Sequence, residues 1–190
     1  SLHAVHRDQS HMTSRRSTNG EEDVLALETR KEIFEHVQTN PGIHFSQIKR
    51  DLNMETGLLQ HHLNTLEEYD VLMSEEHRGK RRLFVAEELD DEEREILSSL
   101  RYETTRHILL FLIQKETARN GAIATELGVA PATVSWHVSR LVEDGIVSPV
   151  QDGRTTLYTV TDEELTMQLL VRYRESFVDR AVENVLDFWG

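Results

Sequence analysis

Residues 59–72 read LQHHLNTLEEYDVL, and the same pattern recurs at residues 134–147 as VSWHVSRLVEDGIV. His62 recurs as His137, and apolar residues occupy the same places in both stretches. Apolar residues three and four apart are typical of one face of a helix, and each stretch ends in an apolar pair that favours a strand. The chain is therefore predicted to contain one structural unit twice.

The elements around these stretches follow one order in both units: two helices, the repeated helix and a β-hairpin. The hairpins align if one residue is dropped, so that Gly79-Lys80 matches Gly153-Arg154. The first unit is predicted to contain helices near residues 21–39, 46–52 and 55–69 and strands near 71–75 and 82–86. The second is predicted to contain helices around 108–113, 122–127 and 131–144 and strands near 147–150 and 156–160.

Polar residues with a preference for helix starts mark three of the predicted helices. Ser46 is expected to cap the second helix of the first unit. Asp90 with Glu93 forms a capping-box pattern before an acidic linker helix, and Thr161 with Glu164 forms another before the last helix.

These elements predict a mainly α fold with small β-hairpins, organised as two tandem units. Ser10-His11-Met12 resembles a cloning remnant, which leaves open whether residues 1–11 are native. The predicted boundaries are 1–19 for a disordered tail, 20–88 and 89–160 for the two units, and 161–190 for a C-terminal helix.

A single last helix of about 27 residues is predicted after the second hairpin. Leu169, Tyr173, Phe177 and Val185 lie in its apolar rows, and a stripe that wide needs a partner surface. The helix either packs on the chain's own units or pairs with a second copy. A homodimer through this helix is the favoured interpretation, because two-fold dimers are the commonest oligomers.

The net charge of −13 is unusual for a protein that contacts phosphate through Lys and Arg. The basic residues are 17 Arg and only 4 Lys, and an acidic, lysine-poor surface resembles that of halophilic proteins, whose self-repulsion is screened by salt. The absence of Cys excludes disulfides and thiolate metal sites. Without a signal peptide or a run of roughly 18 apolar residues, a cytoplasmic protein with no membrane association is predicted.

The first predicted hairpin concentrates cations in the sequence RGKRR at residues 78–82. These cations either clamp phosphates and straddle a minor groove, or they neutralise the nearby Glu75 and Glu76. DNA contact is the favoured interpretation, because an acidic protein that concentrates its few cations is expected to use them. The predicted phosphate-contacting residues are Arg78, Lys80, Arg81 and Arg82, with Arg154 alone in the second hairpin.

The repeated helices carry the residues expected to read bases. Val134, Val138 and Leu141 cluster on one face of the second of these helices, so Trp136 points outward. An outward Trp either stacks on a sugar or touches a thymine methyl, or it packs against another protein surface. Gln and Asn side chains can pair with adenine and Arg with guanine, and the alternative is that they are ordinary solvated residues. The candidates are Gln60, His61, Asn64, Thr133, Ser135, Trp136 and Arg140.

Four segments resemble archaeal winged helix-turn-helix transcriptional regulators, broadly of the ArsR and MarR type. They are ETRKEI at 28–33, NPGIHF at 40–45, LQHHLNTL at 59–66 and TVSWHVSRL at 133–141. The resemblance covers roughly residues 24–160 and implies two tandem winged helix-turn-helix domains, promoter DNA as the target and the third helix of each domain as the reader. Family members often carry Arg or Lys after the Ser of that helix, whereas this chain has Trp136 and His61 at those positions.

No metal site, cofactor or enzyme activity is predicted. The repeated His62 and His137 suggest a metal or pH sensor, but convergent ligands are missing and a hydrogen-bonded ring is the preferred interpretation. The sequence contains no glycine-rich phosphate loop, serine nucleophile elbow or His-Glu-x-x-His motif.

The sequence therefore predicts a regulator of transcription that binds double-stranded DNA, with the third helices in the major groove and the basic hairpin on the backbone. One alternative is a protein-interaction module that has lost DNA binding. A small-molecule sensor is also compatible, with a pocket between the units and the C-terminal helix and an effector that the sequence does not name.

Overall fold

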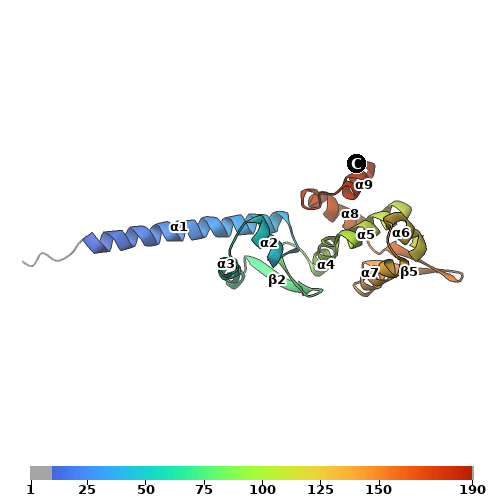
Figure 1. Cartoon of the computed structure of the whole chain (residues 1–190), viewed down its shortest axis with the longest axis horizontal. Helices are drawn as coiled ribbons and strands as arrows, with labels where there is room; N and C mark the ends of the chain where they lie inside the picture. The colour runs from blue at the N-terminus through green and yellow to red at the C-terminus, as the bar shows by residue number, and fades with distance from the viewer. Residues whose placement is uncertain (1–9, 190) are drawn as a thin grey trace, which may run out of the picture.

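Two similar units lie one after the other along the long axis of the computed structural model, which describes residues 10–189 (Figure 1). Each unit contains three helices and a three-stranded antiparallel sheet whose last two strands form a hairpin. This arrangement is a winged helix-turn-helix, and the predicted mainly α fold with two tandem units is confirmed.

The first unit starts with a long helix and has a sheet in the order β1-β3-β2, so β3 is the central strand. The sheet is closed by the short pairing of Ile43 with Leu83. Its elements are α1 (Ser10–Thr39), β1 (Ile43–His44), α2 (Phe45–Asp51), α3 (Thr56–Glu68), β2 (Leu72–His77) and β3 (Lys80–Val85).

The second unit follows the linker helix α4 (Asp91–Leu100) and has the matching sheet order β4-β6-β5. Pro131 occupies the first turn of its third helix, because proline suits that position. Its elements are α5 (Glu103–Lys115), β4 (Ala118–Arg119), α6 (Asn120–Leu127), α7 (Pro131–Glu143), β5 (Val147–Asp152) and β6 (Thr155–Val160).

The repeat keeps the same spacing in the hairpins as in the helices before them, so the predicted one-residue shift is wrong. Ile43 pairs with Leu83 in the first sheet, and the equivalent positions, Ala118 and Tyr158, pair in the second. Gly79 and Gly153 are not equivalent, because they occupy different positions of their turns. The residue equivalent to Gly153 in the first hairpin is Arg78, which has a positive φ of 53°.

Two hydrophobic cores stabilise the molecule, and β3 contributes to both. Ile33, Leu63 and Leu83 lie in the first core. Phe84, the next residue on β3, belongs instead to the second core, which extends from α4 through α5 to the C-terminal segment. The central strand of the first unit therefore joins the two units physically.

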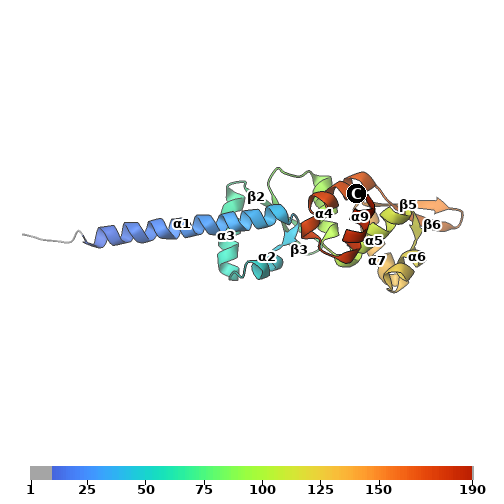
Figure 2. The same ribbon diagram turned by 90° about the horizontal axis from the view of Figure 1, so that it is seen from above.

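The predicted disorder of residues 1–19 is wrong for residues 10–19, which form the start of α1. No proline interrupts the chain before Pro41, so a polar helix can extend beyond the part that packs on the unit. Figures 1 and 2 show α1 projecting from the body of the molecule. Residues 1–9 of the predicted tail lie outside the described residues.

The predicted single C-terminal helix is also wrong. The segment contains α8 (Glu163–Arg172), a 3-10 turn η1 (Arg174–Ser176) and α9 (Arg180–Trp189). The break occurs because Phe177 is buried and Asp179, directly before α9, accepts a hydrogen bond from the Val182 amide at 2.9 Å. Val182 and Val185 are buried in the second core, so the apolar stripe packs within its own chain.

The predicted helix caps are only partly confirmed. The Asp90–Glu93 capping box forms at the start of α4. Ser46 is not a cap, because β1 holds His44 in an extended conformation and α2 starts at Phe45. Thr161 is not a cap either, since Asp162 accepts the hydrogen bond from the Leu165 amide at 2.9 Å.

Candidate nucleic-acid interface

The helix α7 presents the face that the sequence predicts. Val134, Val138 and Leu141 are buried, whereas Thr133, Ser135 and Trp136 are exposed. These exposed residues lie in the N-terminal half of the helix, which is the part that a helix-turn-helix directs at base edges.

Trp136 forms a stacked group with its neighbours on α7. The indole is 54% exposed, and the Arg140 guanidinium lies 3.8 Å from its ring centroid. The His137 ring meets the indole edge-on at a centroid distance of 4.8 Å. Because the indole is held by cation–π and aromatic contacts but is still half exposed, it offers a flat apolar surface to a partner.

The corresponding surface on α3 is less available. His61 and Asn64 are exposed as predicted. Gln60, however, donates from Nε2 to Asn64 Oδ1 at 2.6 Å and accepts from the Arg81 guanidinium at 3.1 Å. Both polar ends of its amide are occupied within the protein, so the predicted adenine contact by Gln60 would require these bonds to break.

Two cations of the first hairpin serve its own unit rather than solvent, which corrects the prediction that they are free for phosphate. Arg82 is only 2% exposed and donates to the Gly42 carbonyl at 2.7 Å. It is buried because β3 is the central strand, with β1 on one side and β2 on the other. Arg81 forms an ion pair with Glu67 of α3 at 2.6 Å.

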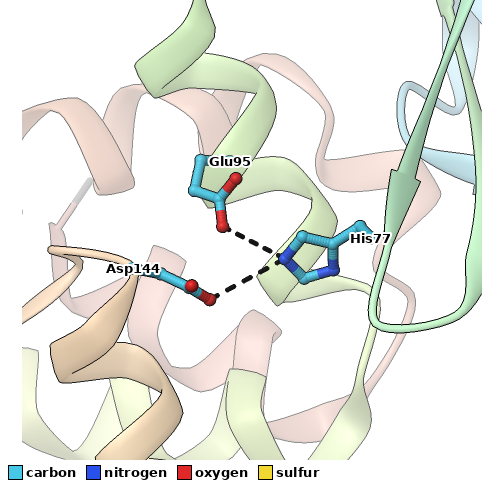
Figure 3. Close-up of side chains that lie close together, drawn as sticks. All are labelled: His77, Glu95 and Asp144. Atoms are coloured by element: carbon cyan, nitrogen blue, oxygen red, sulfur yellow. Dashed lines mark hydrogen bonds and ion pairs between the residues drawn. The ribbon is translucent and has the colours of Figure 1, made fainter.

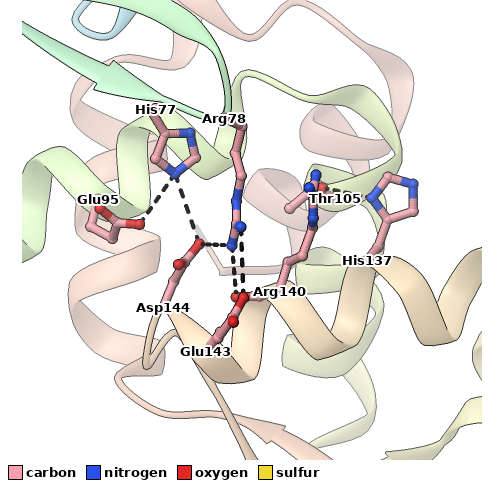
Figure 4. Close-up of polar contacts among 8 residues, drawn as sticks. All are labelled: His77, Arg78, Glu95, Thr105, His137, Arg140, Glu143 and Asp144. Atoms are coloured by element: carbon pink, nitrogen blue, oxygen red, sulfur yellow. Dashed lines mark hydrogen bonds and ion pairs between the residues drawn. The ribbon is translucent and has the colours of Figure 1, made fainter.

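Arg78, at the hairpin turn, reaches the second unit (Figure 4). Its guanidinium contacts Asp144 at 2.9 Å and Glu143 at 3.6 Å, and it donates to the Arg140 carbonyl at 3.3 Å. These acceptors lie at the C-terminal end of α7, where a cation is favoured by the helix dipole. The predicted phosphate clamp is therefore, at Arg78, a contact between the two units.

Two of the predicted hairpin cations remain exposed. Lys80 has no carboxylate partner among the side chains that the structure describes, although its ammonium lies 5.9 Å from the centroid of the Tyr102 ring. Arg154, at the tip of the second hairpin, is exposed and has no ion-pair partner in the described part of the chain. The cations that can meet a polyanion are thus spread over both units.

A polar cluster that no sequence pattern indicates, drawn in Figure 3, lies beside Arg78 (Figure 4). His77 Nε2 is 3.2 Å from Glu95 and 3.8 Å from Asp144. Burial, and then the nearby Asp144 carboxylate, raises the pKa of Glu95 to about 7, while burial lowers the pKa of His77. The three side chains come from β2, α4 and the end of α7, so no local sequence pattern indicates their proximity.

The cluster has the residue types of a metal site, with the ligand atoms of all three within 4.8 Å of one another. Arg78 already contacts Asp144, and a cation placed among these groups would compete with the guanidinium. We therefore describe it as a polar contact between the units.

The repeated histidines each contact the first helix of their unit. Arg30 donates to His62 Nδ1 at 3.3 Å, and the Thr105 hydroxyl lies 3.4 Å from His137 Nδ1. Arg30 and Thr105 themselves occupy equivalent positions of the repeat. Burial lowers the pKa of both histidines, which favours neutral rings at neutral pH.

Comparison with known proteins supports two helix-turn-helix domains in tandem. Residues 27–97 match a family described as an N-terminal HTH domain, and residues 103–148 match a winged helix-turn-helix DNA-binding family. The chain is 30% identical over 145 residues to an uncharacterized HTH-type transcriptional regulator of the archaeon Methanocaldococcus jannaschii. That alignment covers 76% of this chain but 36% of the relative, so the chain spans about a third of the relative's length.

The solved structures to which the chain is similar include HlyU from Vibrio cholerae, with a TM-score of 0.41 and 21% identity over 47% of this chain and 96% of HlyU. NolR from Sinorhizobium fredii is similar with a TM-score of 0.39 and 24% identity, over 47% of this chain and 88% of NolR. Within residues 10–189, no helix is both long and apolar enough to cross a bilayer.

Proposed function

We propose that this chain, which carries two helix-turn-helix domains in tandem, binds double-stranded DNA in a sequence-specific manner and regulates transcription. The observation that carries the proposal is the exposed N-terminal half of α7, where Thr133, Ser135 and Trp136 face solvent beside Arg140. The HTH-type regulator of similar sequence supports the same function.

In this proposal the second unit makes most of the base contacts. The N-terminal half of α7 enters the major groove, where Trp136 touches a thymine methyl or a sugar and Arg140 faces a guanine. Arg154 contacts the flanking phosphates from the hairpin tip. The charge of −13 requires that such contacts be made locally, since the molecule as a whole repels DNA.

The first unit plays the smaller part. Its helix α3 ends in Glu67 and Glu68, and His61, Asn64 and Lys80 remain as its exposed candidates for contact. Both α3 and α7 lie along the lower side of the molecule in Figure 1, which supports contact of the two units with one duplex. A chromosomal target would place the protein in the cytoplasm.

The predicted homodimer remains a prediction. Most of the apolar stripe that motivated it is buried within the chain, although Val178 and Phe188 of the C-terminal segment are exposed. Light scattering of the full chain measures the oligomeric state directly.

Fluorescence anisotropy with labelled genomic promoter fragments tests the proposed function. We expect Arg140→Ala to weaken binding to the preferred fragment about tenfold, because a bidentate Arg–guanine contact contributes roughly 1–3 kcal/mol. Arg174→Ala is the matched control, since Arg174 is exposed on the C-terminal segment, across the second unit from α7 (Figures 1 and 2). Equal losses in the two variants, or no binding by the unmodified chain, would contradict the proposal.

A further inference from the structure

A cavity of about 320 Å³ lies where the first unit meets α5 and the C-terminal segment. Its walls come from β1 and α2 on one side and from the start of α5 and residues 176–178 on the other. This is the region between the units and the C-terminal segment in which the sequence allows a small-molecule pocket. The volume is within the range of about 300–1,000 Å³ that is common for small-molecule sites.

Four cationic side chains line the cavity, and three of them lack a carboxylate partner in the described part of the chain. Lys80, Arg82 and Arg101 form no ion pair there. Arg101 instead donates to the Pro41 carbonyl at 2.9 Å, and Arg82 donates to the Gly42 carbonyl. The fourth, Arg106, is neutralised by Asp179 at 2.6 Å.

The one carboxylate in the lining is already engaged. Asp51 contacts His36 at 2.9 Å and accepts a hydrogen bond from Gln47 at 2.6 Å. The cavity therefore has an excess of positive charge that the surrounding side chains do not balance.

Two buried donors in the lining have no hydrogen-bond partner among the described residues. The Nε group of Arg82 is one, on a side chain that is almost completely buried. The hydroxyl of Tyr102 is the other. Since more than nine in ten buried polar groups in proteins are hydrogen-bonded, two orphan donors on residues that line one cavity indicate a missing acceptor, which these almost inaccessible atoms reach after a small side-chain movement.

The titration behaviour of the lining is consistent with an excess of positive charge. Burial, followed by Arg82 and Arg106, lowers the pKa of Arg101 to about 9, so the guanidinium is destabilised but still charged at neutral pH. Burial, followed by Lys80 and Arg82, lowers the pKa of His44 to about 4. His44 is therefore neutral at neutral pH and adds no further charge.

We propose that this cavity is a binding site for a small phosphate monoester. A dianion is favoured over a monoanion because three cations lack a counter-charge, and phosphate oxygens can accept from both Arg82 Nε and the Tyr102 hydroxyl. The cavity is larger than an inorganic phosphate needs, and the buried Phe177 ring, which lies 4.5 Å from the Arg101 guanidinium, provides an apolar wall for a short carbon chain. This binding activity does not depend on the proposed DNA contact, although Lys80 is a candidate residue for both.

Isothermal titration calorimetry of the full chain with glycerol 3-phosphate, at constant ionic strength set with sodium chloride, tests the site. We expect saturable binding of one ligand per chain, weaker binding of inorganic phosphate and no heat from neutral glycerol. Acetate distinguishes a general anion site from a phosphate site, and acetate binding as strong as that of the phosphate ester would overturn the assignment. The absence of saturable heat with both phosphates would overturn the site itself.

Two matched pairs of variants locate the binding. Tyr102→Phe is expected to weaken glycerol 3-phosphate binding about tenfold, because it removes one hydrogen bond to a charged acceptor. Tyr173→Phe removes another buried, unpartnered hydroxyl that does not line the cavity, and it should leave binding unchanged.

Lys80→Ala should weaken binding by a similar factor, whereas the exposed Lys115→Ala should not. Thermal unfolding without ligand shows whether each variant is folded. Folded Tyr102→Phe and Lys80→Ala variants that both bind like the unmodified chain would contradict the location.

Discussion

The two β-hairpins occupy the same place in their units and use their cations in opposite ways. The first carries four cations, of which Arg82 is buried and Arg78 and Arg81 are held in ion pairs. The second carries only Arg154, and that residue is exposed. The number of cations in a hairpin therefore does not measure its capacity to bind phosphate, because burial and internal ion pairs decide how many are available.

The recognition helices differ in the same direction. His61 and Trp136 occupy the same position of the repeat, and both point outward. On α3 the neighbouring Gln60 is tied to Asn64 and Arg81, whereas on α7 the Trp136–Arg140 stack faces solvent. The first unit thus uses side chains next to its recognition helix for contacts within the protein. The recognition helix of the second unit keeps its outward face exposed to solvent.

The largest expected effect concerns the strand that joins the units. Phe84→Ala should destabilise the protein by about 3–5 kcal/mol, because Phe84 is fully buried in the core of the second unit. Thr159→Ala, the equivalent change in the second hairpin, should cost about 1 kcal/mol through loss of the hydrogen bond to the Glu116 carbonyl. Urea unfolding measures both. Equal losses would mean that β3 has no special part in joining the units.

Next in size is the difference between the recognition helices. Trp136→Ala should weaken DNA binding about tenfold, since it removes the apolar contact of the indole with the groove and the cation–π partner that orients Arg140, a loss of roughly 1–2 kcal/mol. His61→Ala, at the matched position, should change affinity about twofold or less. Anisotropy titrations of both variants at one salt concentration make the comparison, and the reverse order would assign the main contact to the first unit.

A smaller effect is expected from the cluster between the units. The pKa of Glu95 is raised from 4.5 to about 7, so the folded state binds more protons than the unfolded chain between those values. Stability should therefore decline as pH rises from about 4.5 through 7. Glu95→Gln should remove this decline and gain on the order of 1 kcal/mol relative to the unmodified chain above pH 7, after allowance for solvent screening.

Chemical unfolding of both proteins on either side of this pH window provides the measurement. The charged or titratable groups that act on Glu95 or its partner His77 are Asp144, Arg78, Glu75 and Arg82. A stability difference between the two proteins that does not change with pH would show that Glu95 keeps its ordinary pKa.

The smallest expected effect concerns the hairpin tips. Arg154→Ala should lower the slope of log affinity against log salt by about 0.9, the value for one lost phosphate contact. Arg81→Ala should leave the slope unchanged, because Arg81 is paired with Glu67. If Arg81→Ala alone changes the slope, the ion pair opens when DNA binds.

The fold was accessible from the sequence wherever local chemistry determines it. The repeat predicted both units, and the Asp90–Glu93 box marked the start of α4 correctly. Ser46 and Thr161 failed as caps because the pairing of β1 and a competing Asp162 decided those starts.

The candidate site was less accessible, because long-range contacts decide it. The outward direction of Trp136 follows from helical periodicity alone. Arg78 is engaged within the protein because it forms an ion pair with Asp144, which is distant in the sequence. Arg82 is buried because β3 is the central strand of its sheet. The break before α9 likewise depends on the contact of Asp179 with Arg106.

The emission of Trp136 tests the central claim most directly, namely that the second unit's recognition helix meets DNA. The chain has two tryptophans, so Trp189→Phe leaves Trp136 as the single reporter. On titration with a bound promoter fragment, we expect a saturable change in emission and protection of the indole from acrylamide, with a midpoint equal to that from anisotropy. Full binding by anisotropy with unchanged emission and unchanged quenching would contradict the claim.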